Sequence, residues 1–302
     1  MNLQLILFAA VTSAVLSYIS TPATARLARR IGAIDLPDGG RKRHVGAKPR
    51  LGGLALLVGF SFAILFCQRQ AVALLSGACL IAAVGVCDDA YSLPPAAKLA
   101  CQSASATVPI VFGLSLGDTI VTFAASLVWI VSLTNAYNMI DGSDGLAASQ
   151  GALSGALTAA LLLAARLVGV TPDAALSAAA AALALSAACV GFLPHNRESA
   201  RVFLGDTGAM LIGFSLAAIT LWGGGRAFVP VALGANLLPL SELISTVARR
   251  ASRGARLFSA DRGHLHHLMS DARLSPHAIA VTQALASFTA GCAVLLAMLI
   301  AG

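Results

Sequence analysis

Asparagine and aspartate side chains are dense in the segment NAYNMIDGSDGL, residues 135–146, although apolar segments flank it on both sides. Asn135, Asn138 and Asp141 are spaced three residues apart, so they would share one stripe of a helix. Amide and carboxylate oxygens are hard ligands that suit Mg²⁺ or Mn²⁺, and a diphosphate can complete such a coordination shell. A helix end with an Asp/Gly turn would explain DGSDG. It does not explain the two asparagines, because burial of polar groups near lipid is costly.

Two further segments place acidic side chains where apolar runs end or begin. Asp88 and Asp89 are adjacent in VGVCDDAYSLPPAAK, and Lys98 follows in the same segment. Adjacent carboxylates raise one another's proton affinity unless a cation or donor lies between them, and a solvated helix end is the alternative. Asp206, between two glycines in FLGDTGA, either caps the next helix or brings a carboxylate and a helix N-terminus to a phosphate. Phe203 could offer a stacking face for a base.

The fourth polar segment, RRASRGARLFSADRGHLHHLM, is basic and rich in histidine. It contains Arg262, His264, His266 and His267 close together. Such a cluster can ligate zinc, but it has neither a cysteine nor an obvious fourth ligand. An anionic substrate suits the segment better, and a basic amphipathic loop on the membrane surface is the alternative.

The composition of the chain requires elements that lie in a membrane. Of 302 residues, 58% are hydrophobic and 11% are charged, whereas about 25% are charged in an ordinary soluble domain. Lipid offers no partner for the backbone, so the spans must be helices or a closed barrel. The apolar runs are near-continuous and do not alternate with period two, which favours helices. We therefore predict an all-α polytopic membrane protein, one transmembrane domain over residues 1–302, with an active site formed by loops.

About ten transmembrane helices are predicted, because a helix needs about 20 residues to cross, or about 17 at the short end. The run at 208–222 is shorter than that and could begin earlier in the chain. The predicted spans are 3–21, 51–68, 70–87, 96–114, 118–134, 145–167, 174–194, 208–222, 226–247 and 280–301.

Positive charges fall on one side of these spans. Of the 20 lysines and arginines, only Arg69, Arg166 and Arg226 belong to the connections on the other side. Since lysine and arginine stay in the cytoplasm, the four polar segments are predicted on the cytoplasmic face and both termini outside. The net charge of +7 thus reflects topology and membrane lipids, and no nucleic-acid partner is expected. A face that gathers carboxylates, amides, a lysine and histidines suits phosphoryl transfer, where cations offset charge on the transferring group.

Together the polar segments resemble the polyprenyl-phosphate N-acetylhexosamine-1-phosphate transferases of glycosyltransferase family 4. The resemblance runs through RKRHVGAKPRLGGLA (41–55), DD (88–89), NAYNMIDGSDGL (135–146), FLGDTGA (203–209) and DRGHLHHLM (261–269). The HLHH pattern after a DR pair is more similar to the WecA/TagO branch than to the related MraY branch.

The resemblance implies an enzyme of the bacterial inner membrane with a cytoplasmic active site. It would transfer a HexNAc-1-phosphate, by default GlcNAc-1-phosphate, from a UDP-sugar to undecaprenyl phosphate and release UMP. Mg²⁺ would be required, with Mn²⁺ as a substitute, and a homodimer is expected because family members often form one.

The resemblance also implies roles by motif position. Asn138 and Asp206 would hold the metal ion, and Lys98 would hold phosphates. Asp144 and Phe203 would contact the uracil. The remaining candidates for catalysis or substrate binding are Asp88, Asp89, Asn135, Asp141, Arg262, His264, His266, His267 and His44.

Asp88 is the candidate general base at the lipid phosphate, beside Asp89. A phosphate monoester has a second pKa near 6 and is already largely ionised at neutral pH. Positioning could therefore carry the catalysis without a strong base.

Two alternatives stay open. One is the MraY-type reaction, with UDP-MurNAc-pentapeptide as the donor. The other is a transporter with a cation site at the membrane midplane, although transporters place ionisable groups deep in broken helices. The spans predicted here carry almost no charge at their centres.

Overall fold

The structure is a computed structural model that describes residues 3–37, 46–64, 70–254 and 264–301. Within these residues the regular secondary structure is helical apart from one short pair of strands. The elements are α1 (Leu3–Ile31), β1 (Ile34–Asp35), β2 (Lys48–Pro49), α2 (Gly52–Ile64), α3 (Gln70–Tyr91), α4 (Pro95–Val111), α5 (Ile120–Ile140), α6 (Leu146–Leu167), α7 (Ala175–Asn196), α8 (Gly205–Gly223), a 3-10 turn η1 (Gly225–Ala227), α9 (Phe228–Ser252), α10 (Leu265–Asp271) and α11 (Pro276–Ala301).

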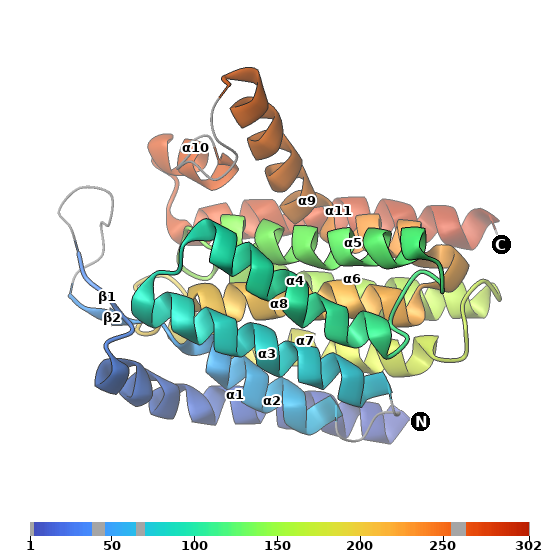
Figure 1. Cartoon of the computed structure of the whole chain (residues 1–302), viewed down its shortest axis with the longest axis horizontal. Coiled ribbons are helices and arrows are strands. Elements are labelled where there is room, and N and C mark those ends of the chain that lie inside the picture. Colours follow the sequence, from blue (N-terminus) through green and yellow to red (C-terminus); the bar gives the residue numbers. More distant parts are fainter. Residues whose placement is uncertain (1–2, 38–45, 65–69, 255–263, 302) are drawn as a thin grey trace.

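The long helices lie side by side, and both termini lie at the end of the bundle opposite to the hairpin and α10 (Figure 1). Eight helices of the described part are long and apolar enough to cross a membrane, namely α1, α3, α5, α6, α7, α8, α9 and α11. The prediction of an all-α polytopic membrane protein is confirmed. Helices α2 and α4 coincide with two further predicted spans but are shorter, with 13 and 17 residues. The number of ten spans therefore stays a prediction.

Helix α8 forms the centre of the bundle. Every residue of α8 except Asp206 is buried, against α2, α3, α5 and α7. Small side chains on α8 allow the neighbouring helices to approach closely. Close van der Waals packing of this kind drives helix association in a membrane, where lipid is as apolar as the helices. The helix begins at Gly205, three residues before the predicted span, so Asp206 lies on the first turn of the most buried helix.

Helix α9 is broken where it passes the bundle interior. Asn236 has non-helical backbone angles (φ −127°, ψ 21°). Pro239 lacks the N–H that would donate to the Ala235 carbonyl, and the Ser154 hydroxyl donates to that carbonyl instead, at 2.6 Å. The Asn236 side chain donates to the Ala232 carbonyl at 3.1 Å. With its free carbonyls satisfied, the second half of α9 leaves the bundle next to α10 (Figure 1).

The hairpin was not expected from the sequence, and it positions the start of α2. Strand β1 pairs antiparallel with β2, with Ile34 opposite Pro49. The Pro49 carbonyl also accepts a hydrogen bond from the Phe203 N–H at 2.8 Å, and the Arg50 N–H donates to the Ala33 carbonyl at 3.0 Å. Arg50 is thereby held beside the segment that leads into α8.

Candidate active site

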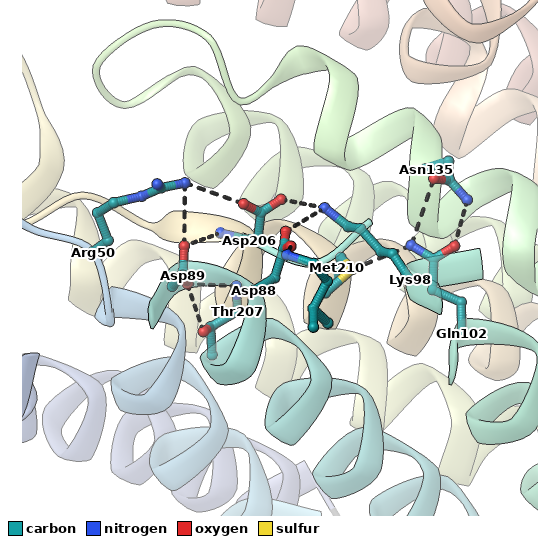
Figure 2. Close-up of polar contacts among 10 residues, drawn as sticks. Arg50, Asp88, Asp89, Lys98, Gln102, Asn135, Asp206, Thr207 and Met210 are labelled. Atoms are coloured by element: carbon teal, nitrogen blue, oxygen red, sulfur yellow. Dashed lines mark hydrogen bonds and ion pairs between the residues drawn. The ribbon is translucent and has the colours of Figure 1, made fainter. Parts of the chain in front are cut away.

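Asp206 lies between two cationic side chains at the hairpin end of the bundle (Figure 2). The Lys98 Nζ atom contacts one carboxylate oxygen of Asp206 at 2.6 Å. The Arg50 Nη2 atom contacts the other at 3.1 Å. The same lysine lies 2.8 Å from the Asp88 carboxylate. Three residues from two polar segments of the sequence, now on α3, α4 and α8, thus form one charged cluster together with Arg50.

Asp89 holds the N-terminus of α8. Its carboxylate accepts hydrogen bonds from the backbone N–H groups of Asp206 and Thr207, both at 3.0 Å, and from the Thr207 hydroxyl at 2.7 Å. Its side chain has no exposed surface and also lies 3.2 Å from Arg50. The first N–H groups of a helix have no partner within the helix, and a carboxylate there also complements the helix dipole. In this arrangement Asp89 positions Asp206 and does not face the open side of the site.

Asp88 has both carboxylate oxygens engaged. One oxygen accepts from the Leu93 N–H at 2.7 Å, in the turn that follows α3. The other accepts from Lys98 at 2.8 Å. The contacts of Asp88 therefore orient the lysine, which suits a positioning role as well as the predicted role of a base.

Gly205 is required by the approach of two segments. Its φ of +72° lies in the left-handed region, and an added Cβ would overlap the Arg50 carbonyl and approach the Asp89 carboxylate to 2.6 Å. A glycine therefore lets the backbone of the Arg50 segment reach the first turn of α8.

Two residues of the site were missed in the sequence, Arg50 and Gln102. Gln102 follows Lys98 by one helical turn on α4, and that spacing was the signal that could have found it. Its carbonyl accepts from the Asn135 amide at 2.8 Å, and its own amide lies 3.2 Å from the Met210 sulfur. The predicted substrate residue Asn135 is thus paired inside the protein, where it links α4, α5 and α8. Arg50 stands directly before LGG in the motif RKRHVGAKPRLGGLA (41–55), from which His44 is the predicted site residue.

Asp141 ends α5 within electrostatic reach of Asp206. Burial raises the pKa of Asp141 to about 8, and the charge of Asp206 acts in the same direction against the opposing charge of Arg50. The side chain is only half-buried, so water moderates this effect. Asn138, one turn earlier, is half-buried and has no side-chain hydrogen bond among the described residues. Two carboxylates, those of Asp141 and Asp206, therefore lie within electrostatic reach of one another at the end of α5.

Asp144 connects the turn after α5 to the segment before α8. Its carboxylate accepts a hydrogen bond from the Ala200 N–H at 3.0 Å. Phe203 lies in that same segment and is half-buried. One hydrogen bond thus ties Asp144 to the segment that carries Phe203, the other residue predicted to contact uracil.

His266 packs directly on the DGSDG turn. A Cβ added to Gly142 would overlap its Nε2 atom, which is buried and has no hydrogen-bond partner within the described chain. Burial, and then the charges of His267 and His264, lower the pKa of His266 to about 4, against the opposing charge of Glu242. His266 is therefore neutral at pH 7 in this state. Its unpaired ring nitrogen faces Gly142.

Glu242 fixes the start of the short helix that carries the histidines. One of its oxygens accepts from the Leu265 N–H at 2.7 Å, and the other lies 3.3 Å from the His264 ring. The His264 and His266 rings stack with centroids 5.5 Å apart. Glu242 on α9 thus positions the start of α10 beside the site. Two predicted site residues, Arg262 and His44, lie outside the described residues.

The metal ligands predicted from the sequence do not form a closed cage. Among the described residues, no three histidine, cysteine, aspartate or glutamate side chains converge as a metal site. Mg²⁺ commonly takes one or two carboxylates and completes its shell with water and phosphate oxygens. Asp206 and Asn138 supply hard oxygen donors, and Asp141 places a further carboxylate within electrostatic reach of Asp206.

Replacing Gly142 by alanine is expected to lower turnover by about 10²-fold, because His266 must move from the site and small misplacements in active sites have effects of that size. The thermal midpoint should stay near the wild-type value, since the ring can shift. The measurement is a double-mutant cycle with His266→Ala. If Gly142→Ala acts through His266, the double variant is no slower than His266→Ala alone. Effects that multiply would contradict the contact.

Comparison with known proteins identifies the family to which the chain belongs. A sequence model described as glycosyl transferase family 4 matches residues 71–224. A decaprenyl-phosphate N-acetylglucosaminephosphotransferase of Mycobacterium tuberculosis is 31% identical, over 85% of this chain and 73% of its own. A probable undecaprenyl-phosphate N-acetylglucosaminyl 1-phosphate transferase of Bacillus subtilis is 29% identical, over 87% and 76%. An undecaprenyl-phosphate alpha-N-acetylglucosaminyl 1-phosphate transferase of Escherichia coli is 30% identical, over 81% and 71%. The chain belongs to glycosyl transferase family 4, as one of its polyprenyl-phosphate N-acetylhexosamine-1-phosphate transferases.

Proposed function

We propose that this enzyme transfers GlcNAc-1-phosphate from UDP-GlcNAc to undecaprenyl phosphate in a Mg²⁺-dependent reaction at the cytoplasmic face of a bacterial inner membrane. The observation that carries the proposal is the position of Asp206 between Lys98 and Arg50, next to Asp141. The names of the relatives support the sugar and the lipid acceptor. The gathering of most basic residues on the site's side of the spans supports the cytoplasmic orientation.

The reaction is a displacement at phosphorus. An oxygen of the lipid phosphate attacks the phosphorus that carries the sugar, a new P–O bond forms, and the bond to the UMP oxygen breaks with its electron pair leaving on UMP. Lys98 and Arg50, which pair with Asp206 in the free protein, are placed to contact phosphate oxygens once substrate arrives. Their charges offset the negative charge that accumulates in the transition state. The lipid phosphate is already ionised, so Asp88 acts by orienting Lys98.

The residues present fit a bound magnesium ion. Asp206 and Asn138 would hold it, with substrate oxygens and water in the remaining positions. Bound there, Mg²⁺ supplies Lewis-acid stabilisation of the phosphoryl oxygens. Asp89 holds the Asp206 backbone in place for this role. Asp144, in the turn after α5, and Phe203, in the segment before α8, offer contacts to the nucleoside.

A donor screen tests the proposed function. Purified protein, undecaprenyl phosphate and Mg²⁺ are incubated with UDP-GlcNAc, UDP-GalNAc or UDP-MurNAc-pentapeptide, and the lipid product is identified by mass. We expect UMP release and a GlcNAc diphosphate lipid only when the acceptor is present. Product from the pentapeptide donor would favour the MraY-type reaction. Substrate flux into liposomes without acceptor would favour a transporter.

The proposed metal ligand Asn138 gives a second test. Chelation should abolish turnover, and added Mg²⁺ should restore it. Asn138→Ala is expected to raise the Mg²⁺ concentration for half-maximal turnover by about tenfold or more, the scale seen when support of a bound metal is removed. Asn135→Ala is the matched control on the same helix, because its amide is paired with Gln102. A rise in the Mg²⁺ requirement of the control alone would contradict the assignment.

A further inference from the structure

A polar pocket lies away from the candidate active site, where α1 passes the end of α7. Its volume is about 370 Å³. None of the side chains that line it belongs to the cluster around Asp206. They are Tyr18, Pro194, His195, Arg197, Glu198, Ser199 and Arg201.

The side chains of this pocket give it a positive balance. Arg197 and Arg201 are both exposed, and among the described residues neither has an ion pair. Glu198 is the single carboxylate that lines the pocket. The His195 Nε2 atom lies 3.2 Å from the Tyr18 carbonyl, so it must donate there, because a carbonyl only accepts. A phosphate that entered the pocket would therefore meet two guanidinium groups, which bind phosphate through paired N–H donors.

The backbone that carries these side chains is fixed. The His195 carbonyl accepts hydrogen bonds from the N–H groups of Arg201 and Val202, at 2.9 and 3.2 Å. The Tyr18 and His195 rings contact one another with centroids 4.8 Å apart. The wall between α1 and α7 is thus held by contacts that do not involve either guanidinium group, which leaves both free to bind.

An exposed apolar surface leads up to the pocket. Val11, Val15 and Tyr18 follow one face of α1 and are 63%, 50% and 49% exposed, and Val190 on α7 is 53% exposed. Side chains of this kind on a spanning helix face acyl chains, and tyrosine is enriched where the apolar region meets the headgroups. The pocket therefore lies at headgroup level, directly above a lipid-facing surface. Basic pockets between transmembrane helices bind the headgroups of anionic lipids.

We propose that this pocket binds the phosphate headgroup of an anionic phospholipid, with Arg197 and Arg201 on the phosphate and the acyl chains along Val15 and Val190. The pocket also shares residues with the segment 197–204, which leads to Asp206. The Ala200 N–H, between the two arginines in sequence, donates to Asp144. A bound headgroup would therefore stabilise the segment that leads to α8.

Binding of phosphatidylglycerol to the purified full-length chain in detergent, counted by native mass spectrometry, tests the proposal. Arg197→Gln/Arg201→Gln is expected to weaken the tightest lipid-binding event by about tenfold or more, because it removes both positive charges that attract the phosphate. Arg166→Gln/Arg226→Gln removes the same charge at the opposite end of the bundle and should leave binding unchanged. Arg197→Lys/Arg201→Lys should restore most of the binding, which separates lost charge from a disturbed fold.

Two further arms distinguish the source of the phosphate. Phosphatidylcholine should bind more weakly than phosphatidylglycerol to the wild type, and inorganic phosphate at millimolar concentration should not displace the bound lipid. Equal binding of both lipids, displacement by inorganic phosphate, or an unchanged affinity of the glutamine variant would each overturn the proposal. The proposed sugar transfer is not required for any of these readouts.

Discussion

Asp206→Asn is expected to lower turnover by about 10³-fold while the protein remains folded. The substitution keeps the size of the side chain but removes the charge that holds Lys98 at 2.6 Å and Arg50 at 3.1 Å. It also replaces a carboxylate with a weaker ligand for a divalent cation. Removal of one preorganised electrostatic contact in an active site lowers turnover by about 10²–10³-fold. The rate of UMP release at saturating Mg²⁺ measures the effect.

The matched control for that substitution is Asp173→Asn. Asp173 pairs with Arg166 at 3.4 Å on the surface, away from the charged cluster. Its removal should change turnover less than about twofold, since exposed ion pairs contribute little. Near-normal turnover in Asp206→Asn would place the chemistry elsewhere in the protein.

Asp89→Ala is expected to lower the free energy of unfolding by about 2–4 kcal/mol, from the loss of a helix cap and of a buried partner for Arg50. The N–H groups of Asp206 and Thr207 would then lose their side-chain acceptor at the start of α8. The thermal midpoint in detergent should fall by roughly 5 °C or more. Turnover should also fall, because the first turn of α8 carries Asp206.

Asp89→Asn separates the two contributions of that side chain. An asparagine keeps one accepting oxygen at the helix N-terminus, so it should recover part of the thermal midpoint, although its NH2 group cannot accept the second backbone N–H. It cannot recover the ion pair with Arg50, which lies 3.2 Å away. Asp118→Ala, at an exposed position, is the control. If Asp89→Ala unfolds no earlier than this control, Asp89 does not cap α8.

The fold class and the meeting of Asp88, Lys98 and Asp206 were predictable from the sequence because both depend on local features. A long run of apolar residues identifies a spanning helix whatever that helix packs against. Eight helices of the described residues are long and apolar enough to cross a membrane. The charged and amide residues of the four motifs stand at the ends of those runs, so the ends that share a side of the membrane can meet. Lys98, Asp88 and Asp206 do meet.

Some element bounds depend on tertiary contacts and were not predictable from the sequence. The hairpin of β1 and β2 has two residues in each strand, too few to produce an alternating pattern. Its pairing depends on contacts with the distant Phe203 segment. The early start of α8 at Gly205 likewise depends on the cap that Asp89 supplies from α3.

The sequence by itself determined that this chain is a bundle of membrane helices with oxygen donors and cations at one end, because hydropathy and residue type are carried by each segment alone. Only the tertiary structure decided which carboxylate does what. Asp88 and Asp89 are adjacent in the chain, yet one orients Lys98 and the other caps α8. Likewise, only the tertiary contacts of Arg50 with Asp206 and of Gln102 with Asn135 show that these two residues belong to the site. Such roles depend on which groups face one another across three helices, and no local pattern of residues encodes that.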